Sequence, residues 1–185
     1  MKVLLHQFVP MATPMSQPQR LMIGLRAALI SEGVDADFFR WYDGDQTGDI
    51  MHFWGRIPSG LVRLAHQKNL RVVFTENLWK HRHESEWKRC ARRMLVSCGS
   101  KMLPYQILTN FDWQSYRIAE GCVVRSEQEK QFIVDVFGAN PAKVRVIQMG
   151  DEPDESGNVF ISEEKIFSAA RELKSFYEAL LKTSR

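Results

Sequence analysis

The feature that most constrains the fold is a regular alternation of short apolar segments with longer amphipathic ones. The apolar segments are rich in Val, Ile, Leu and Phe and have the length of buried β-strands. Strands that alternate with helices favour βαβ units, and right-handed crossovers gather such units into one parallel sheet. The six expected strands are residues 2–8, 34–41, 48–55, 70–77, 122–126 and 143–149.

Helix-start and helix-stop residues stand between these strands. Pro58 is suited to open a helix, because its fixed φ fits the first turn. Ser126 and Glu129 have the spacing of a capping box, and Gly138 is suited to end the helix that follows. The prediction is an α/β protein with a doubly wound, mostly parallel, six-stranded Rossmann-like sheet.

The last part of the chain predicts one long amphipathic helix. Residues 152–161 are acidic and contain Pro and Gly, as a linker does. In residues 162–185, Ser162 is the expected N-cap, and two Glu follow in the first turn. We expect this C-terminal helix to pack back on the domain formed by residues 1–151. The side chains at helical spacing are Ile166, Ala170, Leu173, Tyr177 and Leu180.

Composition narrows the class of protein. In 185 residues, 44% are hydrophobic and 25% charged, which are ordinary globular values, and the net charge is +3. No apolar run approaches the roughly 18 residues of a membrane span. Cys90, Cys98 and Cys122 lack metal-site spacing, so we expect core residues, no metal site and a cytoplasmic location. We expect no cofactor and, since no recognition motif accompanies the charge, no nucleic-acid partner.

Candidate ligand-binding residues follow from a rule for open α/β sheets, in which ligands bind beyond the carboxyl ends of the strands. An aromatic side chain beside hydrogen-bonding groups suits a sugar ring. The expected ligand-binding residues are His52, Trp54, Arg56, Thr75, Glu76, Asn77, Ser126 and Asp151.

Each of the main candidates also has a simpler interpretation. Packing accounts for Trp54 equally well, and His52 fits a satisfied core histidine. Glu76 reads equally as a solvated loop residue. Ser126 is explained fully by its capping role, although a helix N-terminus also favours an anion.

A second candidate is a basic cluster on the segment 84–98. Four basic residues share one face of a predicted helix, opposite Trp87, Ala91 and Met94. Such a face can contact anionic lipid or a phosphate-bearing acceptor, which makes a peripheral membrane contact an expectation. The alternative is a basic face that is only solvated. The four residues are Lys88, Arg89, Arg92 and Arg93.

Six sequence segments, in order, resemble a known family. They are "KVLLHQF", "LISEGVDADFF", "GDIMHFWG", "LRVVFTEN", "AEGCVVRSEQEKQFIVDVFG" and "KVRVIQMGD". Together they resemble the N-terminal, acceptor-side domain of GT-B glycosyltransferases of the retaining, glycogen-synthase-like superfamily. The resemblance spans nearly the whole of residues 2–151.

The resemblance implies two facing Rossmann-like domains, the first binding mainly the acceptor and the second the nucleotide-sugar donor. Only a short linker stands here between the last strand and the C-terminal helix, whereas the family has its donor domain there. That helix takes the place of the family's crossover helix, which packs back on the N-terminal domain. The sequence therefore resembles a GT-B protein with the donor domain deleted and the crossover helix retained.

Two departures from the family weaken the chemistry that it implies. The loop after the first strand, residues 9–19, lacks the glycines that let the backbone approach a diphosphate. The place of a common family histidine reads Thr75-Glu76-Asn77, and an amide cannot accept a proton as imidazole does.

The expected function is therefore an acceptor-side half of a glycosyltransferase. We expect it to be inactive alone and to need a donor-binding partner chain, or a homodimer, to cover an open edge around His52 and Trp54. The alternative is a non-catalytic module that binds a glycan, a nucleotide or a protein. A different small Rossmann-like enzyme is disfavoured, because no Gly-rich phosphate loop is present.

Overall fold

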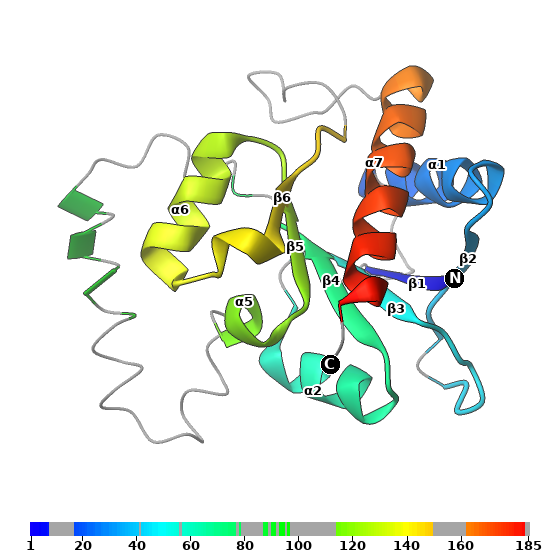
Figure 1. Ribbon diagram of the computed structural model, residues 1–185, viewed down its shortest axis with the longest axis horizontal. Helices are drawn as coiled ribbons and strands as arrows, with labels where there is room; N and C mark the ends of the chain where they lie inside the picture. The colour runs from blue at the N-terminus through cyan, green and yellow to red at the C-terminus, as the bar shows by residue number, and fades with distance from the viewer. Residues whose placement is uncertain are drawn as a thin grey trace.

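The computed structural model describes residues 1–7, 17–40, 42–55, 57–76, 78, 87, 88, 90, 91, 93, 94, 96, 114–149 and 162–183. Their centre is one six-stranded sheet in the order β2-β1-β3-β4-β5-β6, with every neighbouring pair parallel (Figure 1). The strands are β1 (Lys2–Gln7), β2 (Asp35–Phe38), β3 (Ile50–Trp54), β4 (Arg71–Thr75), β5 (Gly121–Val124) and β6 (Val144–Val146). The six predicted strands are confirmed, each shorter than its apolar segment.

Helices cover both faces of this sheet, so the doubly wound α/β fold is confirmed (Figure 1). One face carries the helices α1 and α7, and the other carries α2, α5 and α6. A short 3-10 turn, η3, leads into β6. The bounds are α1 (Gln17–Ser31), α2 (Ser59–Gln67), α5 (Ser115–Ile118), α6 (Glu127–Phe137), η3 (Pro141–Lys143) and α7 (Glu163–Lys182).

The ends of α6 follow the predicted capping residues. Ser126 precedes the helix with extended backbone, and its Oγ accepts from the N–H of Glu129 at 3.3 Å. The Glu129 carboxylate accepts from the N–H of Arg125 at 2.8 Å, one residue before the cap. Gly138 ends the helix with φ of 66°, a left-handed conformation that costs glycine little. These caps set where α6 begins, directly beyond the carboxyl end of β5.

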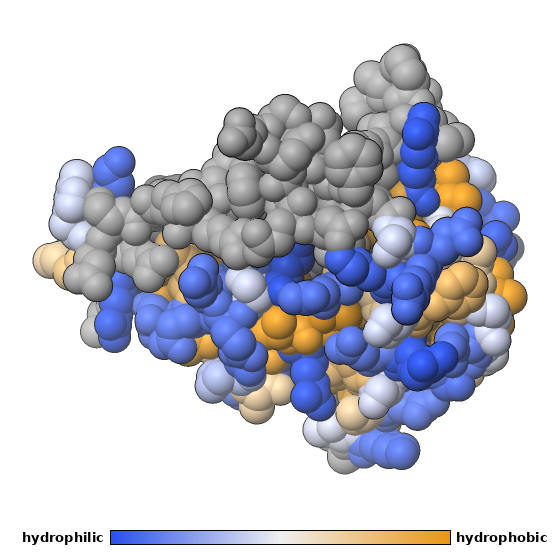
Figure 2. Space-filling view, turned by 90° about the horizontal axis from the view of Figure 1, so that it is seen from above, coloured by the Kyte–Doolittle hydropathy of each residue, from blue (hydrophilic) through white to orange (hydrophobic). Residues whose placement is uncertain are grey.

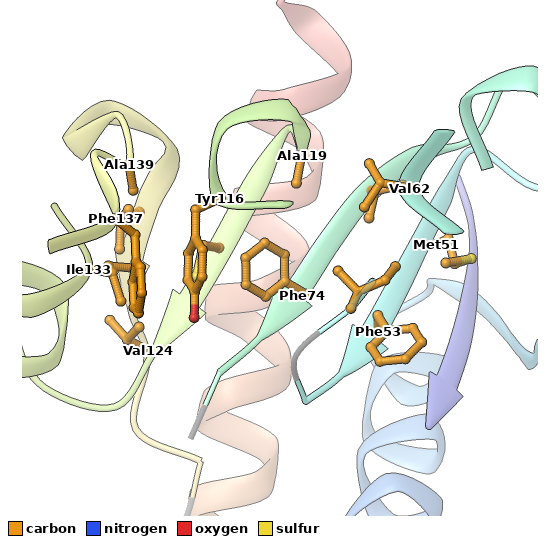
Figure 3. Close-up of a cluster of buried hydrophobic side chains, with 14 of the residues drawn as sticks. Met51, Phe53, Val62, Phe74, Tyr116, Ala119, Val124, Ile133, Phe137 and Ala139 are labelled. Atoms are coloured by element: carbon orange, nitrogen blue, oxygen red, sulfur yellow. The ribbon is translucent and has the colours of Figure 1, made fainter. Parts of the chain in front are cut away.

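Aromatic side chains dominate the core between the sheet and α2, α5 and α6. Tyr116 of α5 stacks on Phe137 with ring centroids 4.7 Å apart and meets Phe74 of β4 edge-on at 5.2 Å (Figure 3). Cys122 of β5 is buried on the same side, as predicted. Cys90 is exposed, so its prediction as a core residue is wrong; Cys98 lies outside the described residues.

The helix α7 packs on α1 and on the sheet, as the spacing of its apolar side chains predicts. Ala170, Leu173 and Tyr177 are fully buried there. Ile166 and Leu180 are partly buried against the same cluster. The pattern is amphipathic, so burial of this one face holds the helix to the domain.

The approach of α7 to the sheet depends on a residue without a side chain. A Cβ at Gly121 of β5 would lie 2.6 Å from Cζ of Phe176, closer than real Cβ contacts. Polar contacts also join α7 to the rest of the domain, across what we call the seam between α7, α1 and the sheet. The Arg71 guanidinium donates to the carbonyl of Leu180, and Lys174 Nζ donates to the carbonyl of Glu32 at 2.6 Å. Ser162 stands at the N-cap position, but its side chain makes no capping hydrogen bond.

Candidate functional site at the carboxyl ends of the strands

The topology selects one edge of the sheet as the place for a ligand. From β1 the chain goes to β2 on one side, and β3 then lies on the other side of β1. In open α/β sheets, ligands bind at such a switch point, outside the carboxyl ends of the strands. We call five residues, in the last three positions of β3 and at or directly after the ends of β4 and β5, the carboxyl edge: His52, Trp54, Thr75, Glu76 and Arg125. Figure 2 views the molecule from the end at which α7 begins, where the visible described residues are mostly hydrophilic.

His52 lies inside the molecule and is only 1% exposed. Its Nε2 lies 2.7 Å from Oγ1 of Thr75, and its Nδ1 is hydrogen-bonded to the hydroxyl of Tyr177. Burial lowers the pKa of the imidazole to about 3, so the ring is neutral. One ring nitrogen then donates and the other accepts, which is the arrangement of a satisfied core histidine.

The expectation that His52 is open at the edge is therefore wrong, because α7 covers it. Its predicted role in ligand binding stays a prediction. Burial also raises the pKa of the Tyr177 hydroxyl far above its ordinary value, so this side chain remains a neutral partner. The hydrogen bond joins β3 to a residue of α7 that is distant in sequence.

Trp54 ends β3 and is half-buried beside the cluster under α1 and α7. Its ring centroid lies 5.9 Å from that of His52, at an interplanar angle of 34°. The side chain thus combines packing with a surface that a ligand can reach. The other predicted residues of the loops, Arg56, Asn77 and Asp151, lie outside the described residues.

Glu76 follows β4 and is only 5% exposed, so its interpretation as a solvated loop residue is wrong. Its Oε2 accepts from the hydroxyl of Tyr116 at 2.8 Å, and its N–H donates to the carbonyl of Val123 at 2.9 Å. A buried carboxylate needs such partners, because desolvation is costly. Thr75, the residue before Glu76, is also buried, and its hydroxyl is hydrogen-bonded to His52.

Arg125, directly after β5, is the residue that sequence reasoning missed. Its Nε and Nη1 are buried and have no hydrogen-bond partner among the described residues. Burial lowers the pKa of the guanidinium, and the nearby Glu129 carboxylate opposes that shift. Two buried donors without acceptors among the described residues are unusual in a folded protein, which makes Arg125 a candidate for binding an oxygen-bearing ligand. The signal was present, since Arg125 stands between a buried strand and an N-cap.

Ser126 is engaged in capping α6, as the simpler interpretation holds. Of the basic cluster, Lys88 and Arg93 are exposed, whereas Arg89 and Arg92 lie outside the described residues. In the part of the chain that the structure describes, no group of three or more His, Cys, Asp or Glu side chains could hold a metal ion. No described helix is long and apolar enough to cross a membrane.

The carboxyl edge thus holds two kinds of polar group. His52, Thr75 and Tyr177 satisfy one another inside the protein, and Glu76 is held by Tyr116. Two buried nitrogens of Arg125 have no hydrogen-bond partner among the described residues, and the ring of Trp54 is partly exposed. Such a set can bind a ligand that carries hydroxyl or phosphate oxygens. Compared with models of known protein families and with curated protein sequences, the chain matches none.

Proposed function

We propose that this chain is the acceptor-side half of a GT-B-type glycosyltransferase, inactive alone and completed by a donor-binding partner chain. The course of α7 carries the proposal. After β6 the chain passes through residues 150–161 and returns as α7 to pack on α1. The resemblance assigns that place to the crossover helix, which follows the donor domain in the family.

The carboxyl edge supports a binding role for this half. The buried donors of Arg125 suit hydroxyl or phosphate oxygens of an acceptor. Trp54, half-buried at the end of β3, gives an aromatic surface against which a sugar ring can pack. In this proposal Arg125 anchors the acceptor and Trp54 orients it.

The described part of the edge supplies little acid–base chemistry. The His52 ring is enclosed by Tyr177 and Thr75, and a pKa of about 3 makes it a weak proton acceptor. In this proposal the donor-binding chain brings the remaining groups that the reaction needs. This is why we expect no transfer by the chain alone.

The alternative is a non-catalytic module that binds a glycan, a nucleotide or a protein. The observation that favours it is the internal use of the buried polar groups. His52 and Glu76 both bond to side chains of the same domain, Tyr177 and Tyr116. A binding module needs only the donors of Arg125.

The experiment compares the purified chain with a reconstituted pair. The genome is first searched for a neighbouring reading frame that encodes a lone donor domain; its product is then the partner, and transfer from labelled nucleotide sugars to glycan acceptors is measured. We expect no turnover by the chain alone and turnover by the pair. Trp54→Ala should reduce the activity of the pair, whereas Tyr42→Ala, at an exposed aromatic residue elsewhere, should not.

Two outcomes would decide against the proposal. Turnover by the chain alone, lost on Glu76→Gln, would show that it is a complete enzyme. A pair that forms and binds glycan without any transfer would favour the non-catalytic module.

A further inference from the structure

The helical segment between residues 87 and 96 turns its apolar side toward solvent. The described helical residues are 87, 88, 90, 91, 93, 94 and 96, drawn in green at the margin of the molecule in Figure 1. At about 100° per residue, Trp87, Cys90, Ala91 and Met94 share one side of the helix. Val96 lies on the opposite side.

Burial shows which side faces the protein. Val96 is 3% exposed, whereas Trp87 is 70% and Met94 65% exposed. Cys90 and Ala91, between them on the helix surface, are exposed as well. A surface helix of a globular protein ordinarily shows the reverse, with the apolar stripe inward. An exposed stripe of this kind marks an interaction surface.

Basic residues border the stripe. Lys88 and Arg93 are exposed and fall on either side of it in the helical projection. The Lys88 Nζ lies 5.9 Å from the centroid of the Trp87 ring. Trp at the centre of an apolar face with Lys and Arg at its borders is the composition of helices that lie in the interface of a bilayer. The charge fits anionic headgroups, whereas a protein groove would need a rim of acidic residues to match it.

We propose that this helix docks the chain on an anionic membrane surface. Trp87 and Met94 enter the boundary between headgroups and acyl chains, and Lys88 and Arg93 contact the headgroups. The stripe that sequence analysis set opposite the basic residues thus belongs to the same docking surface. The inference does not depend on the proposed glycosyltransferase role.

The test uses the full chain with vesicles of phosphatidylcholine alone or mixed with phosphatidylglycerol, measured by co-sedimentation. We expect binding to the mixed vesicles only, weakened by salt. Lys88→Gln with Arg93→Gln should weaken binding roughly 25-fold, since each basic residue at an anionic surface contributes about fivefold. Trp87→Ser with Met94→Ser should weaken it by about tenfold or more, because the inserted apolar area is lost.

Matched variants control for charge and exposure. Lys68→Gln with Lys182→Gln makes the same change in net charge at exposed positions elsewhere, and Tyr42→Ser removes a side chain that is 87% exposed. Both should bind nearly as the unchanged protein does. Since all the altered side chains are exposed, circular dichroism should report folded proteins.

Failure to bind either kind of vesicle would overturn the proposal. Binding that the Trp87 and Met94 changes leave intact would overturn it as well. If those changes instead abolish self-association, and no vesicle binding is found, the stripe is a protein interface and the membrane proposal is wrong.

Discussion

Two basic side chains, one buried and one half-buried, lie on either side of β4 and differ in their hydrogen-bond partners. His52 of β3 has both ring nitrogens hydrogen-bonded, and burial leaves it neutral. Arg125, after β5, stays protonated because of its intrinsic basicity, and two of its buried nitrogens have no partner among the described residues. The first belongs to the architecture of the fold, and the second is a candidate for ligand binding. The presence or absence of hydrogen-bond partners for the buried nitrogens separates these two roles.

The physical reason lies in the cost of desolvation. A buried polar group that keeps its partners contributes about 0.5–1.5 kcal/mol net, but leaving one partner unsatisfied costs about 1–3 kcal/mol. His52 and its partners are in the first condition. Replacing His52 by an apolar residue would put the hydroxyls of Tyr177 and Thr75 in the second. Arg125 is already in the second condition, and a ligand oxygen would relieve it. Variants of the two residues should therefore differ in the sign of their effect.

The largest expected effect comes from disrupting the packing of α7, the helix that covers His52. Leu173 is fully buried in the seam between α7 and the sheet. Leu173→Asp places an unpaired charge there and should lower the free energy of unfolding by about 3–5 kcal/mol. Chemical denaturation measures this change. Ser175→Asp, at an exposed position of the same helix, should change stability by less than about 0.5 kcal/mol. Equal stability of the two variants would mean that α7 contributes little.

The seam also shows what sequence could predict. The five predicted side chains of α7 do face the domain, because their positions follow from helical periodicity alone. Phe176 joins them, and its contact with Gly121 could not be predicted, since it depends on where α7 crosses β5. The parallel direction of the strands followed from the alternation of elements, whereas their order in the sheet comes from the structure. Strand ends did not, because apolar composition continues past the last ladder hydrogen bond.

The candidate site was less predictable, because contacts between residues distant in sequence decide which of its side chains are enclosed. The carboxyl-end rule placed His52 and Glu76 near the edge, yet whether each is open or enclosed depends on residues distant in sequence. Tyr177 reaches His52 from α7, and Tyr116 reaches Glu76 from α5. The same rule applies to Arg125, which directly follows β5, but only its neighbour Ser126 was predicted from the sequence. No local pattern tells that its donors lack acceptors.

The second prediction tests His52 through pH. Its folded pKa of about 3 lies below the ordinary 6.5, so the unfolded chain binds a proton that the folded protein resists. The stability from neutral His52 is complete above pH 6.5 and is lost as pH falls toward 3, at up to about 1.4 kcal/mol per pH unit. His52→Leu should cost about 1–3 kcal/mol at neutral pH, by orphaning the hydroxyls of Tyr177 and Thr75. The difference from the unchanged protein should shrink in acid.

Denaturation curves recorded across this pH range measure the effect. His6 titrates in an overlapping window, since burial lowers its pKa to about 4, so only the difference between proteins isolates His52. Tyr177→Phe is the matched control: it keeps the imidazole, should lower stability, and should keep the dependence on pH. A constant difference between His52→Leu and the unchanged protein at every pH would contradict a neutral, enclosed ring.

The smallest expected effect on stability comes from Arg125→Met, and it is the one that decides the comparison. Methionine keeps an apolar stem of similar length and removes two buried donors that lack acceptors. Replacing a poorly compensated buried charge by an apolar side chain is often neutral or mildly stabilising. The free energy of unfolding should therefore stay the same or rise by about 1 kcal/mol, whereas Arg20→Met, at an exposed residue of α1, should have no effect. Inorganic phosphate, as an oxyanion probe, should raise the melting temperature of the unchanged protein and of Arg20→Met but not of Arg125→Met. If Arg125→Met instead destabilises the protein as much as His52→Leu does, its guanidinium is a structural group like the imidazole, and the carboxyl edge loses its candidate anchor.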